Sequence, residues 1–521
     1  MTAQPTPTTA PPVRRPARRW AGLAVLVTAV LMLGIDATVL ALAIPALSAD
    51  LAPSATELLW IGDIYSFAVA GLLVTMGALA DRVGRKRVLL VGATGFGLAS
   101  ALAAFAPTAE TLIAARFLLG VTGATLMPST LSLIRNLFPE PRERTRAIAI
   151  WSAAASAGVA LGPLVGGVLI EHFWWGAVFL INVPVVIALV VAGWLLLPES
   201  RDPRPGPFDL VSSALSMLAV VPLVFAVKHV ADGGADLLAL TTAAVGVLAG
   251  WAFIRRQRRL PSPMIDVALF RNAAFSGAVL ATLISVFALS GLLYFFSQYL
   301  QLARGFTPIQ AGLAELPSTL ASLAAIALVG LTLRRFGLGR SIATGLALTS
   351  LGLLLVAATE GAESYVWLAM ALVPLGLGVG LTLTLCTDAV VGTAPAHKAG
   401  AASAISETAY ELGVALGIAV LGSLLSVLYR SGLALPAGLP AETGDQVRES
   451  LASAVTVLPP DSELVHTAQE AFVHAMQTTA VIAALLALAG AVIAWRTIPR
   501  VAAAPAGHDS TLEPQPLGRG A

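Results

Sequence analysis

Fourteen apolar stretches of about twenty residues each, joined by short polar connections, constrain the fold of this chain more than any other feature. An α-helix needs about 20 apolar residues to cross a bilayer, so each stretch predicts one membrane span. The predicted spans lie near residues 20–47, 57–80, 88–106, 110–134, 147–170, 176–197, 209–228, 236–254, 272–302, 309–333, 341–359, 365–392, 399–429 and 475–496. The chain is 57% hydrophobic and only 12% charged, which is more apolar surface than a soluble domain of 521 residues can bury. The sequence therefore predicts an all-α integral membrane protein.

The basic residues predict the orientation of the spans, because cytoplasmic loops are enriched in lysine and arginine. With the N-terminus in the cytoplasm, all but five of the 31 lysines and arginines fall on cytoplasmic segments. Four exceptions are expected on the external side and one inside a span: Lys228, Arg304, Arg430 and Arg448 outside, and Arg116 within. The even number of spans then places both termini in the cytoplasm.

A charged, proline-containing connection at 201–207 and a strongly basic connection at 255–259 divide the chain into parts. We expect, in chain order, a cytoplasmic tail at 1–19, a six-helix bundle at 20–200, an inserted two-helix hairpin at 208–254, a second six-helix bundle at 272–497 and a cytoplasmic tail at 498–521. The external segment 430–474 is expected to be a solvated spacer. The alternative is a partly helical flap over the external mouth.

The residue types present exclude several functional classes. Cys386 is the only cysteine, so neither a disulfide nor a cysteine-based metal site can form within one chain. None of the three lysines follows a glycine-rich phosphate loop, which argues against an ATP-driven pump. No nucleophile–base pair or metal-ligand set is evident in the sequence. We expect no enzymatic activity, no bound metal, no nucleic-acid partner and a monomeric protein in the lipid bilayer.

Four carboxylates lie inside the predicted spans: Asp36, Asp63, Glu407 and Glu411. An ionisable group at this depth is costly, so each is a functional-site candidate. Arg116 is expected near enough in level to Asp36 to be its counter-charge, and an arginine that approaches or withdraws can change whether a carboxyl group holds a proton. We expect Asp36 and Arg116 to couple proton movement, with a permanent structural ion pair as the alternative.

Asp63 shares a helix face with Trp60 and Phe67. A carboxylate beside aromatic rings suits a lipophilic cation, because the charge and the ring quadrupole both attract it. We therefore expect Asp63 and Trp60 to bind substrate. The alternative for Trp60 is an anchor at the membrane interface.

Glu407 and Glu411 lie one helical turn apart, with Tyr410 beside them. Two acids at this spacing repel each other when both ionise, so one keeps its proton unless a cation arrives. We expect these three residues to bind a cationic substrate, and the two glutamates also to release and take up protons.

Two glycine-containing motifs stand out, one in the loop after the second span and one within the fifth span. The loop after the second span contains Gly77, Asp81, Arg82, Gly84 and Arg85, and a similar spacing recurs at Gly330, Arg335, Gly337 and Arg340. This internal repeat is expected of a carrier built from two parallel halves. The fifth span contains Gly158, Gly162, Pro163, Gly166 and Gly167. The four-residue glycine spacing allows another helix to approach closely, and ordinary tight packing would also explain it.

Together, these motifs resemble the major facilitator superfamily. More narrowly, the stretch from Trp20 to Trp495 is similar to the fourteen-span drug:proton antiporter-2 family and to its quaternary-ammonium multidrug exporters. The resemblance implies two six-helix bundles with an inserted hairpin, in the cytoplasmic membrane of a bacterium, driven by the proton gradient without a cofactor. It makes 77–85 a cytoplasmic gate, in which Asp81 latches the cytoplasmic side, and associates 158–167 with export. Asp81 as a surface ion pair with Arg82 or Arg85 is the alternative.

The implied activity is export of small lipophilic cations, such as quaternary ammonium biocides and ethidium, in exchange for protons. Ser322 stands where some of these exporters carry an aspartate, so a preference for divalent cations does not follow. Two other activities remain open. One is export of a single endogenous antibiotic, lipid or metabolite, and the other is a membrane receptor or scaffold that transports nothing.

Overall fold

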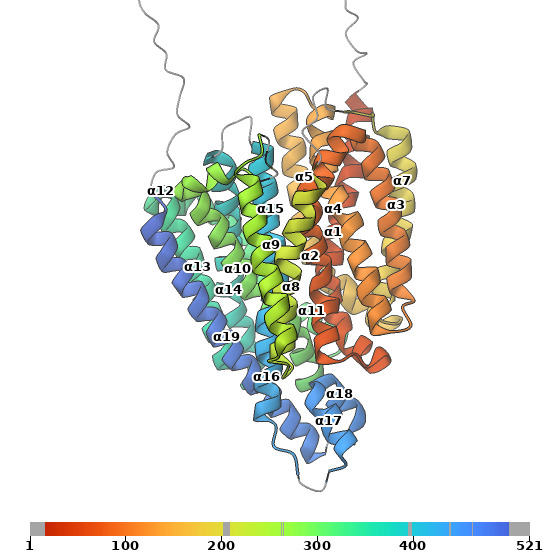
Figure 1. The fold of residues 1–521 in the computed structure, drawn as a ribbon, viewed down its shortest axis with the longest axis vertical. Helices are drawn as coiled ribbons and strands as arrows, with labels where there is room; N and C mark the ends of the chain where they lie inside the picture. The colour runs from red at the N-terminus through yellow and green to blue at the C-terminus, as the bar shows by residue number, and fades with distance from the viewer. Residues whose placement is uncertain are drawn as a thin grey trace, which may run out of the picture.

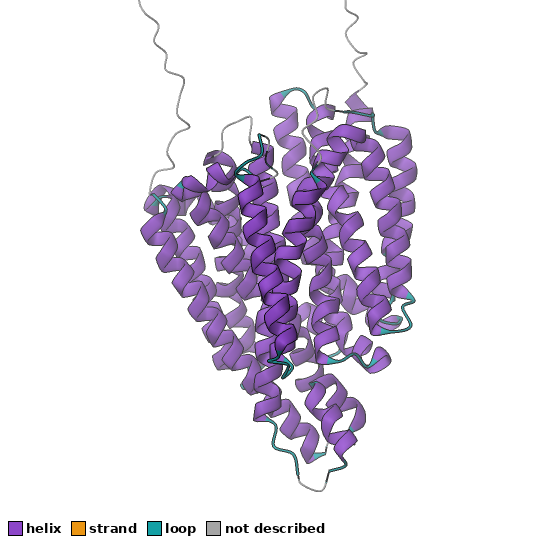
Figure 2. Ribbon diagram, in the orientation of Figure 1, coloured by secondary structure: helices purple, strands orange, loops and turns teal. Residues whose placement is uncertain are grey.

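The computed structural model describes residues 16–201, 209–261, 263, 265–393, 399–436, 439–460 and 462–499. Within these residues the chain is helical and contains no strand (Figure 2). Among the described residues, fourteen helices, some of them interrupted, are long and apolar enough to cross a membrane. The predicted number of spans and the all-α class are therefore confirmed, and the chain is a multi-pass membrane protein.

The first bundle contains six spans. They are α1 (Pro16–Leu51), α2 (Ala55–Val83), α3 (Arg85–Ala104), α4 (Ala109–Leu137), α5 (Pro141–His172), and the short α6 (Ala177–Leu180) continuing into α7 (Asn182–Leu196). Capping boxes at Ser54 and Thr108 start α2 and α4, since each side chain accepts a hydrogen bond from the first helical turn.

The hairpin consists of α8 (Leu210–Ala231) and α9 (Leu237–Gln257). The spans of the second bundle begin with α10 (Ala273–Gln298), which ends in a π-helical turn at Tyr299–Ala303, then α11 (Pro308–Ala314) followed directly by α12 (Leu316–Phe336), and α13 (Leu338–Thr359). They continue with α14 (Tyr365–Thr393), α15 (Ala399–Leu416) joined through a π-helical turn at Gly417–Leu421 to α16 (Gly422–Gly432), and α19 (Glu463–Thr497).

The two bundles lie beside each other, and the hairpin lies against the junction between them (Figure 1). The start of α1 and the end of α19 lie at one end of the molecule, which we call the terminal face. The short helices α17 (Ala441–Glu449) and α18 (Leu451–Val457) lie at the opposite end, which we call the loop face. The bundles are further apart at the terminal face in this view.

The segment 430–474 is largely helical where the structure describes it, which contradicts the expected solvated spacer and agrees with the helical part of the alternative. Val447 and Leu451 are buried, because α17 and α18 fold back against the transmembrane helices. The Tyr429 hydroxyl donates to the Val447 carbonyl at 2.9 Å. The backbone N–H of Ala55, at the start of α2, donates to Glu449 at 2.5 Å. The last span also begins earlier than predicted, at Glu463.

The internal repeat has a structural counterpart. Gly84 connects α2 to α3 with φ 131°, and Gly337 connects α12 to α13 with φ 74°. Both values lie in the region that favours glycine, so a side chain at either position would strain the turn. The two bundles therefore use the same glycine turn at equivalent places.

Candidate functional site

A central cavity of about 380 Å³ lies between the two bundles. Helices α1, α2, α4 and α5 line it from the first bundle, and α10, α12, α14 and α15 line it from the second. Most of the wall is apolar, and three neighbouring residues of α15 provide polar groups: Glu407, Tyr410 and Glu411. Ser322 of α12 also lines the cavity. The structure thus places three of the predicted substrate residues in one chamber.

Glu407 and Glu411 are partly buried and belong to the same helix. No ion pair joins either carboxylate to a cation in the part of the chain that the structure describes. A carboxylate in an apolar chamber is costly as an anion, so it tends to hold a proton or bind a cation. These two acids are therefore chemically suited to exchange one for the other.

Asp36 and Arg116 form a buried ion pair, with 3.8 Å between the Arg116 Nη1 and an Asp36 oxygen. Asn182 of α7 donates to the other Asp36 oxygen at 2.7 Å and contacts the Ser100 hydroxyl at 3.2 Å. Arg116 also donates to the backbone carbonyl of Ile61 at 3.1 Å. Asp36 and Arg116 are not among the residues that line the central cavity. The structure brings together Asp36 and the arginine that we expected as its counter-charge, and adds Asn182, to which the sequence assigned no role.

Tyr65 of α2 connects this ion pair to the central cavity. Its ring centroid lies 4.9 Å from the Arg116 guanidinium carbon, and the same residue lines the cavity that holds Glu407 and Glu411. Tyr65 is therefore the side chain that contacts both the Asp36–Arg116 pair and the cavity of Glu407 and Glu411, so a change in the charge of the pair would alter the electrostatic environment at the cavity wall. Tyr65 had no assigned role in the sequence reading.

Asp63 has a partner that the sequence reading placed elsewhere. Lys228 was expected on the external side, but its side chain is buried in α8, and its ammonium nitrogen lies 2.7 Å from an Asp63 carboxylate oxygen. The same nitrogen lies 3.6 Å from the centroid of the Trp60 ring. Asp63 and Trp60 do not line the central cavity. Lys228 was counted among the external charges, whereas it lies inside α8, which continues to Ala231, and its side chain is buried.

The position of Lys228 at the edge of an apolar stretch was the sequence feature that could have predicted its pairing with Asp63. An ionisable residue within a span is by default a functional candidate. As one of the external charges, Lys228 was not considered as a partner of Asp63. The position of Trp60 beside the acid was expected, and its contact with the Phe67 ring, at 6.4 Å between centroids, agrees with their shared helix face.

The glycines of α5 allow it to lie directly against α1. A β-carbon added at Gly158 would overlap the Leu31 carbonyl oxygen, and one at Gly162 would overlap the Thr38 hydroxyl. One at Gly166 would lie 2.7 Å from a Val39 methyl carbon. The close approach predicted from the four-residue spacing is therefore present.

An adjacent face of α5 contacts the second bundle near the loop face. A β-carbon added at Gly167 would lie 2.7 Å from the Pro308 carbonyl oxygen of α11, and Gly312 lies against the carbonyl of Pro163. The Gln301 side chain donates to the Leu42 carbonyl of α1 at 3.1 Å. These contacts close the space between the bundles on the loop face.

The 77–85 motif forms a compact turn at the terminal face. Asp81 pairs with Arg85 one turn later, at 2.9 Å, which is the surface ion pair that we gave as the alternative. Gly84 is required at its position for a second reason, because an added β-carbon would lie 2.6 Å from the Glu199 carboxylate. Glu199 also accepts from the Lys86 N–H at 3.2 Å. Arg82 is exposed, and Gly77 lies against Pro128 of α4.

A second cavity, of about 440 Å³, lies on the loop face between the end of the π-helical turn after α10, the connection 360–363 and α19. Glu360 is buried beside it, in the connection after α13, and burial raises the pKa of its carboxyl well above the usual range, with a partial offset from Arg304. Arg304 donates to the Tyr299 hydroxyl at 2.7 Å and to the Glu363 carbonyl at 3.1 Å. This cavity shares no lining residue with the central one.

The family model described as Major Facilitator Superfamily matches residues 26–418. The chain belongs to the major facilitator superfamily. Its fourteen candidate spans fit the drug:proton antiporter-2 type within that superfamily, as the sequence motifs indicated. As a major facilitator, the chain is a transporter rather than an enzyme.

Relatives and solved structures agree with this membership. The multidrug efflux pump LfrA of Mycolicibacterium smegmatis is 48% identical over 92% of this chain and 96% of its own length. The methyl viologen resistance protein SmvA of Salmonella typhimurium is 39% identical over 91% and 97%. A bacterial homologue of the human lysosomal transporter Spinster, solved in an inward-facing and unoccupied conformation, superposes with a TM-score of 0.67 over 93% and 98%, at 16% identity. That likeness concerns the fold alone.

Proposed function

We propose that this major facilitator exports lipophilic, mainly cationic compounds in exchange for protons, by alternating access between its two bundles. One observation carries the proposal: an apolar cavity between the bundles contains Glu407 and Glu411, two acids without an ion-pair partner among the described residues. Similarity to proteins named for multidrug efflux and for methyl viologen resistance supports a cationic cargo.

The exchange follows from the electrostatics of neighbouring acids. Two ionised carboxylates one helical turn apart repel each other in an apolar chamber, so protons are retained until a cation enters. A lipophilic cation satisfies the acids and the apolar wall together, and its arrival releases a proton. Protonation from the opposite side of the membrane then removes the attraction and frees the cargo.

The direction of export follows if the terminal face lies in the cytoplasm of a bacterial cell, as the basic residues indicate. The contacts of α5 with α11 close the loop face in the present conformation. The cavity would then receive cargo from the cytoplasm and release it after the loop face opens. The membrane potential contributes about 2.3 kcal/mol per charge per 100 mV, so exchanging more than one proton for a monocation uses both the potential and the pH gradient.

We assign the Asp36–Arg116 pair to proton coupling. A proton on Asp36 would cancel its attraction for Arg116, and Tyr65 lies between that guanidinium and the cavity. Asn182 holds the carboxyl in either state, because an amide can donate to a carboxylate and accept from a carboxylic acid.

Transport in everted membrane vesicles tests the proposal. An acid interior should drive uptake of ethidium, and ethidium or methyl viologen added to energised vesicles should release protons. Vesicles with Glu407→Gln and Glu411→Gln together should do neither, whereas matched vesicles with the surface change Asp445→Asn should behave as wild type. Uptake that persists after the proton gradient is collapsed would refute proton coupling.

A dedicated exporter of one endogenous product is the second candidate. Two relatives at 35% identity favour it: the tetracenomycin C resistance and export protein of Streptomyces glaucescens, and a probable actinorhodin transporter of Streptomyces coelicolor. A panel of chemically unrelated dyes separates the two. Transport of several dyes supports the multidrug exporter, transport of one cellular product supports the dedicated exporter, and binding without flux supports a receptor.

A further inference from the structure

The inserted hairpin brings an ammonium group into the interior of the membrane protein. Lys228 lies near the end of α8, and 1% of its surface is exposed. Its nitrogen lies 2.7 Å from an Asp63 oxygen and 3.6 Å from the centre of the Trp60 ring. A carboxylate beside an aromatic face is the arrangement that recognises alkylammonium ions. Lys228 therefore occupies this site in the way that a bound organic cation would.

The position of Lys228 is fixed near the loop face. Asp232, which follows α8, forms an ion pair with Arg430 of α16 at 2.9 Å and accepts from Thr56 of α2 at 3.3 Å. Arg430 also donates to the Ala231 carbonyl at 2.8 Å. The end of α8 is thus attached to both bundles, within one turn of Lys228.

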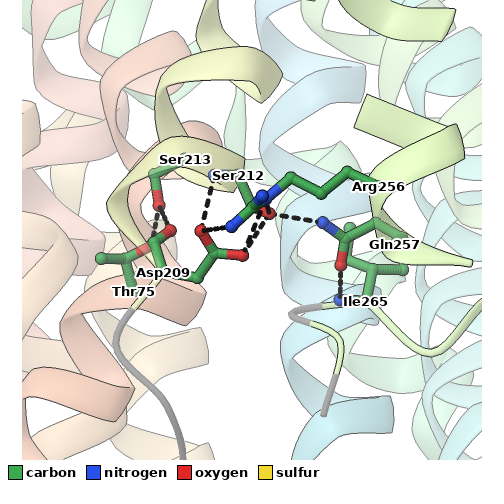
Figure 3. Close-up of polar contacts among 7 residues, drawn as sticks. All are labelled: Thr75, Asp209, Ser212, Ser213, Arg256, Gln257 and Ile265. Carbon is green, nitrogen blue, oxygen red and sulfur yellow. Dashed lines mark hydrogen bonds and ion pairs between the residues drawn. The ribbon is translucent and has the colours of Figure 1, made fainter. Parts of the chain in front are cut away.

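The other end of α8 is also anchored (Figure 3). Ser213 hydrogen-bonds with Thr75 of α2. Ser212 accepts from Gln257 at 2.7 Å, and Gln257 in turn accepts from the N–H of Ile265, on the approach to α10, at 3.1 Å. Anchored at both ends, α8 holds the ammonium at Asp63 as a built feature of the fold.

The four acids predicted inside the spans differ in their partners. Asp36 has Arg116, Asp63 has Lys228, and Glu407 and Glu411 have no cation in an ion pair among the described residues. A lysine in α8 thus changes how many acids remain available to a positively charged cargo. Without it, Asp63 would need a proton or an external cation.

We propose that Asp63 and Trp60 form a second cation-binding site whose resident occupant is Lys228, and that this hairpin lysine limits the positive charge the transporter accepts. The limit on the charge of the cargo rests on the proposed export of cations. The occupancy of the Asp63–Trp60 site by Lys228 does not depend on that proposal, so cation binding at the site can be tested without measuring transport.

The test uses a small amine to replace the missing group. Lys228→Ala removes three methylenes and the ammonium, which together correspond to propylammonium. In the purified full-length protein, we expect Lys228→Ala to lower the thermal unfolding midpoint and propylammonium to raise it again by several degrees in a saturable manner. Neutral 1-propanol is the matched control and should not raise it. The wild type should not respond to propylammonium, and neither should Asp63→Asn combined with Lys228→Ala.

A failure to respond in Lys228→Ala, or an equal response in the double variant, would overturn the proposal. If Lys228→Ala does not fold, Lys228→Met keeps the length of the side chain. It should release about one more proton than wild type on binding methyl viologen, and Asp63→Asn should remove that extra proton. No extra proton would overturn the effect on cargo. Amine rescue in a protein that transports nothing would instead refute the proposed function and leave the site intact.

Discussion

Removing one partner of the Asp63–Lys228 pair should destabilise the protein far more than removing both. The charged atoms are 2.7 Å apart, and both side chains are essentially inaccessible to solvent. At this distance their attraction is about 6 kcal/mol for an effective dielectric constant of about 20. That attraction offsets the cost of burying two charges, so an unpartnered charge left behind is expensive. Loss of one partner of such a pair typically costs about 3–5 kcal/mol.

We expect Asp63→Asn and Lys228→Met each to lower the free energy of unfolding by about that amount. The two changes together leave no uncompensated charge, so the double variant should lie within about 2 kcal/mol of wild type. The exposed Arg448–Asp445 pair on the loop face, at 3.4 Å, provides a matched control. Its removal should change the free energy of unfolding by about 0–1 kcal/mol, because solvent screens the charges.

The assay is reversible unfolding of the purified protein in mixed detergent–SDS micelles, as a double-mutant cycle over the four combinations of each pair. The cycle isolates the interaction between the two side chains. Single variants that cost less than about 1 kcal/mol, or a double variant whose cost equals the sum of the singles, would refute a buried and mutually dependent ion pair.

Three further predictions concern packing, exchange and pH. Gly162→Ala should destabilise the protein by about 1–3 kcal/mol and impair transport, because the added methyl group would overlap the Thr38 hydroxyl. Gly330→Ala is the control and should do neither, because no atom lies within 4 Å of the added methyl group. Unfolding in SDS compares the two variants. Glu407→Gln and Glu411→Gln should each reduce the protons released per ethidium bound while the thermal midpoint stays near wild type, and a pH indicator in weak buffer measures that release. Burial raises the pKa of Glu360 in the folded protein, so the folded state holds this proton more tightly than the unfolded state does. The contribution of Glu360 to folding stability is therefore fully present below the ordinary carboxyl pKa and is lost as the pH rises through the raised pKa. Glu360→Gln should therefore unfold at a higher temperature than wild type near pH 8 and lose this difference near pH 4, and an unchanged pH profile would contradict the argument.

The membrane spans could be predicted from the sequence, whereas several contacts between the helices could not. The fourteen spans were predictable because a bilayer imposes a minimum apolar length on every helix, which can be read along one chain. That Arg116 could be the counter-charge of Asp36 was predictable for the same reason, and their 3.8 Å contact agrees with it. Which helix faces meet is not contained in a hydropathy pattern. Asn182 and Tyr65 therefore remained unassigned, although each lies in a stretch that resembled the family.

The segment 430–474 shows a different limit. Its prolines and acids are typical of a solvated connection, yet Val447 and Leu451 are buried. The segment forms helices because its few apolar side chains pack against the ends of the spans, so tertiary contacts outweigh local helix propensity here.

The sequence by itself determined the number of spans, the glycine turns at Gly84 and Gly337, the close packing of α5 and the presence of costly buried acids. These follow from local chemistry: apolar length, freedom of φ, the absence of a side chain and the cost of charge in lipid. Only the tertiary structure decided the partner of each acid, because electrostatic energy depends on distances between helices that are far apart in the chain. It placed Glu407 and Glu411 in the central cavity, paired Asp36 with Arg116, and occupied the Asp63–Trp60 site with Lys228 from the inserted hairpin.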